Sequence, residues 1–370
     1  MKSKVFFSDM HVRMGDSQLA KFRRLILKAG LKSIDFKDKY VAVKVHFGEW
    51  GNMAFLRQQY AKVLCDEIKA FGGRPFLTDC NTLYVGYRNN ALDHLDVAYM
   101  NGYNPLATGV HTIIADGLRG TDERRIPVEG GDYVKEAKIG AAIAEADVIV
   151  SLSHFKGHIN AGFGGALKNI GMGSGSKQGK MEMHSSGTPR ILMDECIGCG
   201  SCVRNCANDG VSVLNGKAVI NEAKCLGCGY CIAYCPKSAI MTKWDEAKPV
   251  MNKKIAEYAK AVLAGKPAFH INMLIDVSPE CDCDSCNDIP VIPDVGMYAS
   301  FDPVAIDQAC VDAANRQPVI PGSMAAKRHL DEAKHDVFKA VHPDTDWEAG
   351  LVHAEKLGVG SRNYEIVMVG

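Results

Sequence analysis

The sequence predicts an α/β fold in which a mixed, largely parallel sheet with flanking helices carries a small inserted α+β domain. Three observations support this. Short apolar strands alternate with amphipathic helices over the first 152 residues, as in parallel sheets. Two dense cysteine runs then interrupt the pattern, and helix and strand resume after residue 248. We therefore expect a first α/β part at 1–188, a cysteine-rich insertion at 189–245 and a second α/β part at 246–370.

The first part alternates between the two element types. Short apolar runs indicate buried strands, and apolar residues three and four apart indicate helices. The strands are expected at 2–7, 40–47, 74–79, 112–116 and 147–152. The helices are expected at 17–30, 53–71, 90–101 and 133–145. Because parallel sheets bind ligands outside the carboxyl ends of their strands, residues just after the strands are candidates for a site.

The second part begins with a helix at 249–265 and an apolar strand at 268–277. A strand and turn are expected at 289–300. Asp302 and Pro303 have the N-cap and first-turn proline that begin a helix, expected at 303–315. Charge-rich exposed helices are expected at 323–358 and a closing strand at 364–369. Asp302 and Asp307 are further pocket candidates, although capping alone accounts for Asp302.

Each cysteine run has the spacing C-x2-C-x2-C-x3-C, which holds iron–sulfur cubes in bacterial ferredoxins. Three thiolates wrap one face of a cube, and the fourth cysteine of each run serves the other cluster. The predicted ligands of one 4Fe-4S cluster are Cys196, Cys199, Cys202 and Cys235. Those of the second are Cys225, Cys228, Cys231 and Cys206. Paired C-x2-C motifs also build zinc ribbons, but two tandem four-cysteine runs fit two cubes better.

The stretch 193–241 resembles a two-cluster bacterial ferredoxin, and the resemblance implies that the insertion is a ferredoxin-like α+β domain. The second run ends in the usual proline, Pro236. The first run departs from the pattern, because Ala207 stands where that family often has proline.

A second group of candidates follows the strand expected at 147–152. Residues 153–184 gather histidines, lysines and glycines. Glycine lets the backbone approach a ligand, lysine binds carboxylate or phosphate, and histidine binds metal or moves protons. The catalytic candidates, two of them from the strand expected at 40–47, are Lys44, His46, His154, His158, Lys168 and His184. The cofactor-binding candidates are Lys156 and Asn169.

A plainer interpretation remains open for this segment. A single histidine in a loop is usually a hydrogen-bonded structural residue, and Lys177 and Lys180 can be solvated. The glycines match neither a phosphate-binding loop nor the dinucleotide-binding pattern. Taken together, the residues nevertheless predict a pocket for a small anionic ligand.

A third cysteine group follows the strand expected at 268–277. It has the spacing C-x-C-x2-C, formed by Cys281, Cys283 and Cys286. These residues are candidates for a third metal or iron–sulfur site, open at one position or completed by a histidine. The alternative is three reduced thiols in a tight loop. Cys65, Cys80 and Cys310 are expected in the core or at the edge of the pocket.

Composition limits the function classes. The 43 basic and 43 acidic residues balance, so no overall field attracts nucleic acid or an anionic membrane. No apolar run is long enough for a membrane span or a signal peptide. The clustered cysteines favour a reducing compartment, and we expect a cytoplasmic protein.

Four further motifs resemble a known family, the proteins that contain domain of unknown function 362. The motifs are VKVHFGE at 43–49, SHFKGH at 153–158, GGALKNIGMG at 164–173, and PVIPDVG at 290–296 with SFDPVAID at 300–307. The resemblance covers nearly the whole chain, and many members carry an inserted ferredoxin unit. It supports the pocket but implies no substrate, because no activity is established for the family as a whole.

The leading hypothesis is an iron–sulfur oxidoreductase. Two 4Fe-4S clusters would relay electrons from a redox partner protein to a small anionic substrate or metal centre in the pocket. Two alternatives stay open: an electron carrier or metallocluster assembly factor without turnover, and a non-redox isomerase or lyase with structural clusters.

Overall fold

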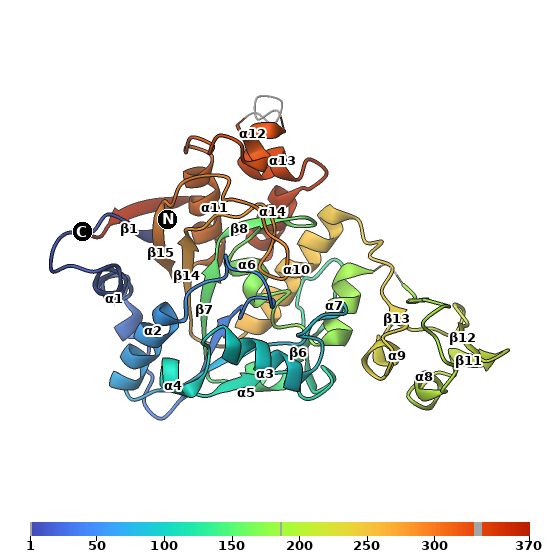
Figure 1. Cartoon of the computed structure of the whole chain (residues 1–370). Coiled ribbons are helices and arrows are strands. Elements are labelled where there is room, and N and C mark those ends of the chain that lie inside the picture. Colours follow the sequence, from blue (N-terminus) through green and yellow to red (C-terminus); the bar gives the residue numbers. More distant parts are fainter. Residues whose placement is uncertain (1, 186, 329–334) are drawn as a thin grey trace.

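The computed structural model describes residues 2–185, 187–328 and 335–370. An eight-stranded sheet runs through the body of the molecule in the order β16-β1-β15-β14-β7-β2-β3-β4 (Figure 1). Its strands are β1 (Ser3–Asp9), β2 (Tyr40–Val45), β3 (Arg74–Asp79), β4 (Thr112–Ile114), β7 (Val148–His154), β14 (Ala268–Leu274), β15 (Gly296–Ser300) and β16 (Tyr364–Met368). Only the pairs that β15 makes are antiparallel. The predicted mixed, largely parallel sheet is confirmed.

Both faces of this sheet are buried, which explains why its central strands are almost continuously apolar. Successive side chains point to opposite faces, so Val41 and Val43 lie in one core and Ala42 lies in the other. Helices α1 (Gln18–Lys28) and α2 (Gln58–Ala70) cover the first face. The second face is covered by α6 (Ala166–Ile170), α10 (Lys248–Leu263), α11 (Pro303–Ala314) and α14 (Trp347–Lys356).

The remaining short helices and strands connect these layers. The helices are η1 (Leu31–Ser33), α3 (Ala91–Met100), α4 (Pro105–Thr108), α5 (Ala141–Glu145), α7 (Lys177–His184), α12 (Met324–Lys327) and α13 (Val337–Val341). The paired strands are β5 (Glu123–Pro127) with β6 (Glu136–Gly140), and β8 (Lys156–His158) with β9 (Gly162–Gly164).

Capping residues fix the predicted helix starts. The Ser17 hydroxyl accepts the amide of Ala20 at the start of α1. The Asp302 carboxylate accepts the amides of Val304 and Ala305, both at 2.9 Å, at the start of α11. Helix α2 begins at Gln58, five residues later than predicted, because residues 53–57 form a loop.

The helix expected at 133–145 is wrong over most of its length. Strand β6 occupies 136–140, and only 141–145 is helical. Ala137 and Ile139 are buried, whereas Glu136 is exposed and Lys138 is half-buried. This alternation is the two-residue period of a strand. Pairing with β5 outweighs the helix propensity of this segment, because the backbone N–H and C=O groups of the two strands hydrogen-bond to each other.

The expectation of exposed helices near the C-terminus is also wrong in part. Helix α13 buries Val337 and Phe338, and α14 buries Leu351 and Ala354. Residues 329–334 of the predicted region lie outside the described residues.

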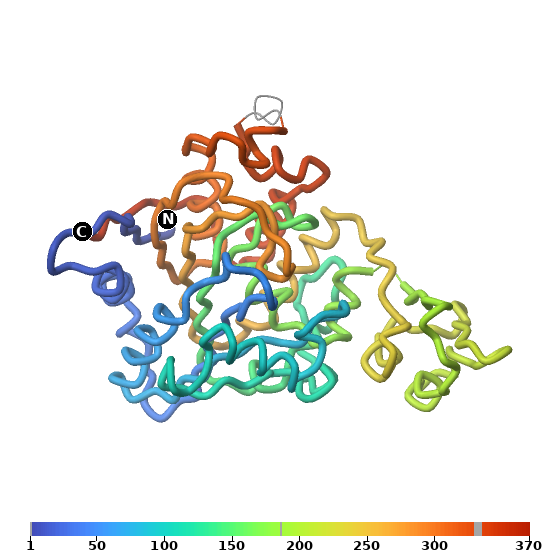
Figure 2. Tube along the Cα trace, viewed as in Figure 1, coloured from blue at the N-terminus to red at the C-terminus, as the bar shows by residue number. Residues whose placement is uncertain are grey.

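A cysteine-rich part projects from one end of the body, yellow-green at the right of Figures 1 and 2. It contains the pair β10 (Arg190–Ile191) with β13 (Ile240–Met241) and the hairpin β11 (Val211–Leu214) with β12 (Lys217–Ile220). Two matching turns of helix, α8 (Ser201–Arg204) and α9 (Tyr230–Ala233), follow Gly200 and Gly229. Both glycines have left-handed φ angles, 71° and 73°, which side chains rarely adopt.

Strand β14, which follows the cysteine-rich part, pairs in parallel with β7, which precedes it. The chain on both sides of this part therefore builds one sheet. Among the described residues, no helix is both long and apolar enough to cross a membrane.

We expect Glu257→Leu to lower the free energy of unfolding by at least about 3 kcal/mol, measured by urea denaturation. The fully buried carboxylate of α10 accepts the amides of Asp132 and Val134 at 2.7 and 2.6 Å, and it contacts His353 at 2.8 Å. Each buried partner left unpaired costs about 1–3 kcal/mol.

The matched control is Glu145→Ala, an exposed glutamate paired with Arg124 at the surface. It should change stability by less than about 1 kcal/mol. Equal effects of the two substitutions would contradict the assigned role of Glu257.

Candidate functional site

A cavity of about 540 Å³ opens where β2, β3 and β7 end. This is the edge at which parallel sheets place their ligands. All eight predicted pocket residues line it: Lys44, His46, His154, Lys156, His158, Lys168, Asn169 and His184. They come from the end of β2 and from the stretch that runs from β7 to α7, and the two parts meet because β2 and β7 are neighbours in the sheet.

Lys44 lies at the floor of the cavity and is almost fully buried. Its ammonium contacts Asp79 Oδ1 at 2.9 Å and Asn169 Oδ1 at 2.8 Å. The Asn169 amide in turn donates to the Lys44 carbonyl and to Ser153 Oγ, both at 3.0 Å. Burial lowers the pKa of Lys44, and the Asp79 charge opposes this shift. Asn169 thus ties α6 to the ends of β2 and β7.

A buried arginine, Arg88, forms a second part of the wall. Its guanidinium donates to Glu49 at 3.1 Å and lies 3.1 Å from His46 Nε2. Burial and this guanidinium hold the pKa of His46 well below its usual range, so His46 is neutral at pH 7. Sequence reasoning missed Arg88, which lies in no recognised motif, and did not single out Glu49 although it ends the motif VKVHFGE at 43–49.

The carboxylate of Asp282 is fully buried between two predicted site residues. Its oxygens lie 2.8 and 2.9 Å from His154 Nδ1, and Lys156 Nζ is 3.6 Å away. His154 Nε2 lies 2.8 Å from the Ile275 carbonyl, which can only accept, so both ring nitrogens face acceptors. His154 is therefore a brace for the cysteine loop. Burial alone would raise the pKa of Asp282, but His154 and Lys156 lower it.

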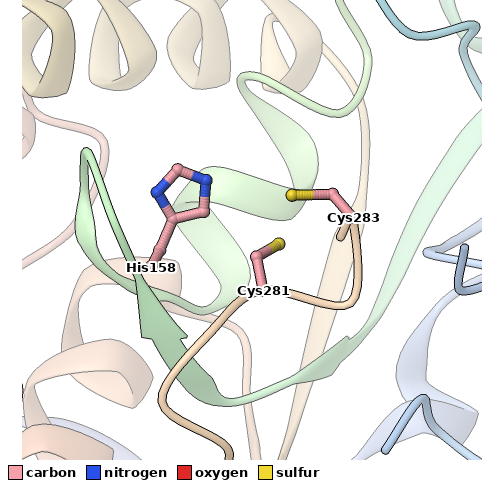
Figure 3. Close-up of side chains that lie close together, drawn as sticks. All are labelled: His158, Cys281 and Cys283. Carbon is pink, nitrogen blue, oxygen red and sulfur yellow. The ribbon is translucent and has the colours of Figure 1, made fainter. Parts of the chain in front are cut away.

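The cysteine loop brings Cys283 to the cavity, with the buried Cys281 beside it. His158, Cys281 and Cys283 place one nitrogen and two sulfurs within 4.8 Å of one another (Figure 3). Lys168 Nζ is 3.9 Å from Cys281 Sγ. Cys286, the third predicted metal ligand, is exposed and lies outside this group. Among the described residues, His158 thus takes the place that the sequence motif suggested for Cys286.

Helix α6 presents Lys168 and Asn169 to the cavity, and Asp307 fixes its start. The buried Asp307 carboxylate accepts the amides of Ala166 and Leu167 at 2.7 and 2.9 Å. Burial raises the pKa of Asp307 to about 6. Asp307 therefore supports the pocket from behind, and Asp302 is the N-cap of α11. Gly165 has no room for a side chain, because a Cβ there would collide with Asp307.

Helix α7 forms the wall between the cavity and the cysteine-rich part. Lys180 and His184 line the cavity, while Met181 packs with the cysteine residues and meets the space beside Gly229. His184 also packs against Trp244, with ring centroids 4.7 Å apart. Burial lowers the pKa of His184 to about 3, so its ring is neutral.

The first predicted cluster set is gathered in one place. Cys196, Cys199, Cys202 and Cys235 line a single small cavity beneath Pro236. The amide of Ala218 donates to Cys196 Sγ at 3.3 Å and lowers the pKa of that thiol. The amide of Ala239 donates to Cys235 Sγ at 3.2 Å. Such amide–sulfur bonds favour the thiolate form that a metal cluster needs.

The second predicted set has a similar arrangement. The amides of Gly227 and Gly210 donate to Cys225 Sγ and Cys206 Sγ at 3.4 and 3.2 Å. Gly210 also lies against Cys225, since a Cβ there would be 3.3 Å from the Cys225 Cα. Burial, then the Cys228 and Cys225 thiolates, raise the pKa of Cys231 to about 12. The fourth cysteine of the first run therefore lies beside the second run.

We expect Asp282→Asn to lower the free energy of unfolding by about 3–5 kcal/mol, because it leaves the buried ammonium of Lys156 without a counter-charge and removes a carboxylate oxygen that contacts His154. Urea denaturation measures the loss. Asp284→Asn is the control in the same loop: its exposed side chain keeps the oxygen that accepts the Cys286 amide, so stability should change by no more than about 0.5 kcal/mol. A stable Asp282→Asn protein would rule out the brace.

Comparison with known proteins gives a family and distant structural neighbours. The lactate racemase apoprotein from Thermoanaerobacterium thermosaccharolyticum matches with 14% identity and a TM-score of 0.44, covering 94% of this chain and 81% of that chain. A protein from Thermotoga maritima matches with 13% identity and a TM-score of 0.39, covering 80% of this chain and 58% of its own. No curated protein matches. The model of the domain of unknown function DUF362 matches residues 41–312, and the chain therefore belongs to the DUF362 family.

Proposed function

We propose that this protein is an iron–sulfur oxidoreductase that acts on a small anionic substrate in the cavity beside α7. One observation carries the proposal. Helix α7 lines the cavity with Lys180 and His184 and packs against the second cysteine run with Met181. A candidate electron-transfer unit and a candidate substrate pocket thus share one short helix.

The cysteine-rich part fits two 4Fe-4S clusters. One set would be Cys196, Cys199, Cys202 and Cys235, which line one cavity, and the other Cys225, Cys228, Cys231 and Cys206. Backbone amides donate to two sulfurs of each set, Cys196 and Cys235 in the first and Cys206 and Cys225 in the second. Such bonds stabilise thiolate ligands. When bound, such clusters supply single electrons at low potential. This part is then a ferredoxin-like domain at 189–245, inserted between α/β parts at 1–188 and 246–370.

The cavity favours an anion because two of its cations, Lys168 and Lys180, lack an acidic partner among the described residues. Lys44 pairs with Asp79, Arg88 with Glu49 and Lys156 with Asp282. Lys180 donates to the Gly175 carbonyl at 2.6 Å, whereas Lys168 has only the Cys281 sulfur, 3.9 Å away, as a hydrogen-bond partner. Its ammonium is therefore available to a carboxylate or phosphate group. The neutral rings of His46, His158 and His184 add hydrogen-bonding groups without adding charge.

Two consequences complete the proposal. The electron source is a one-electron donor protein, the kind of partner that suits 4Fe-4S clusters. The fourteen free cysteines suit a reducing compartment, and we place the protein in the cytoplasm.

We expect Cys225→Ser to lower the iron content of anaerobically purified protein from about eight to about four per chain, the loss of one cube. It should also stop the oxidation of dithionite-reduced clusters by small anionic oxidants such as 2-oxo acids. Leu226→Ala, an exposed neighbour in the same run, is the control and should keep both properties. Unchanged oxidation of the clusters in Cys225→Ser would contradict the proposed electron relay. If no small anion oxidised the clusters of the natural protein, an electron carrier without turnover would be favoured.

We expect Lys168→Gln to weaken the binding of inorganic phosphate, used as a probe, by about tenfold or more, because a hydrogen bond to a charged group contributes about 1.5–3 kcal/mol. Isothermal titration calorimetry measures the affinity. Lys62→Gln removes a lysine from a surface pair with Asp66 on α2 and should leave the affinity unchanged. Equal affinity of the Lys168 variant and the natural protein would contradict the anion site.

A further inference from the structure

Two thiols of the cysteine loop lie side by side at the wall of the cavity. A tight turn, in which the Asp284 amide donates to the Cys281 carbonyl at 3.0 Å, brings Cys281 and Cys283 together. Their sulfurs lie within 4.8 Å of each other and of His158. Cys281 is buried, and Cys283 lines the cavity. The pair therefore has one sulfur shielded from solvent and one at the cavity.

The loop is held rigidly against the strand that carries His158. The Gly157 amide donates to the Ser278 carbonyl at 2.9 Å, and a side chain at Gly157 would collide with the Pro279 carbonyl. The Asp282 carboxylate, between the two thiols in sequence, is anchored by His154. The relative positions of His158 and the two sulfurs are thus fixed from both sides.

The hydrogen bonds of His158 decide what its ring can offer the sulfurs. Nδ1 accepts the amides of Asn160 and Ala161 at 3.1 and 3.0 Å. Because Nδ1 uses its lone pair as an acceptor, the proton of the neutral ring lies on Nε2. Figure 3 shows the other ring nitrogen facing the sulfurs. His158 therefore offers an N–H donor, whereas a metal ligand needs a free lone pair and usually donates from its other nitrogen.

We propose that Cys281 and Cys283 form a redox-active dithiol–disulfide couple, with the Nε2–H of His158 as the hydrogen-bond donor to the sulfur that leaves when the disulfide is reduced. In reduction, the S–S bond takes up two electrons in two one-electron steps and breaks, and the two thiolates take two protons from water to become thiols. The electrons come from a donor of the one-electron iron–sulfur class, so the source of electrons rests on the proposed function. Lys168, 3.9 Å from Cys281 Sγ, stabilises the thiolate that forms first.

The test follows the thiols directly. Full-length protein, purified anaerobically, is equilibrated in buffers with graded ratios of reduced to oxidised dithiothreitol, quenched in acid and alkylated. Mass spectrometry of the peptide that contains residues 281–286 should show a form lighter by two hydrogens, linked between Cys281 and Cys283, that disappears at reducing ratios. Alkylation of both thiols at every ratio would overturn the proposal. So would a stoichiometric metal that protects both thiols until a chelator removes it.

Two variants identify the partners. Cys281→Ser should abolish the linked form, whereas Cys286→Ser should keep it, because Cys286 is exposed and outside the group. The opposite result would show that the wrong pair had been assigned. His158→Ala should slow reduction of the disulfide by dithiothreitol by about tenfold or more, through loss of a hydrogen bond to the leaving thiolate, and His158→Gln, which keeps an N–H donor, should restore part of the rate. Equal rates in all three proteins would remove His158 from the proposal.

The couple and the electron relay can fail separately. In Cys225→Ser, dithiothreitol should still interconvert the linked and free thiols, because this chemistry needs no cluster. A linked form in that variant together with unchanged cluster oxidation would contradict the proposed function and leave the couple intact. Absence of the linked form in a protein with a working relay would contradict the couple alone.

Discussion

A buried carboxylate, Asp282, sets the geometry of the site. A charge of this kind is costly to remove from water, and it persists only where cations and hydrogen-bond donors surround it. His154 and Lys156 meet that need from the end of β7 and from β8. As a result, the loop after β14 is held across the carboxyl edge of the sheet, and its two inner thiols can face Lys168 and His158.

The same compensation of charge explains which residues remain available for a ligand. Most cations of the cavity already have an acidic partner at close range, and these pairs shape the walls. Asn169 and Asp307 then hold α6 so that Lys168 extends toward the cysteine loop. The pocket therefore consists of a rigid, paired framework and two lysines, Lys168 and Lys180, without a carboxylate partner among the described residues.

Sequence patterns could predict the sheet because its strands are buried on both faces and are therefore continuously apolar. They also identified the eight pocket residues, since parallel strands deliver their carboxyl ends to one edge. They failed at 133–145, where antiparallel pairing with the neighbouring strand β5 decides the structure. Arg88 and Glu49 were missed because only tertiary contact joins them. Spacing likewise could not tell that a turn carries Cys286 outward and leaves His158 beside the other thiols.

The position of the cysteine-rich part in the chain is itself informative. It leaves the body after His184 and returns at Trp244, and the two rings pack together at the wall of the cavity. The two connecting segments are joined there, because the Ser185 hydroxyl donates to Asp245 at 3.0 Å and the Glu246 amide donates to the His184 carbonyl at 3.3 Å. An unrelated domain could have been attached at any surface loop. Attachment at the pocket wall is what a unit that exchanges electrons with the pocket requires, since a short path between them depends on this contact.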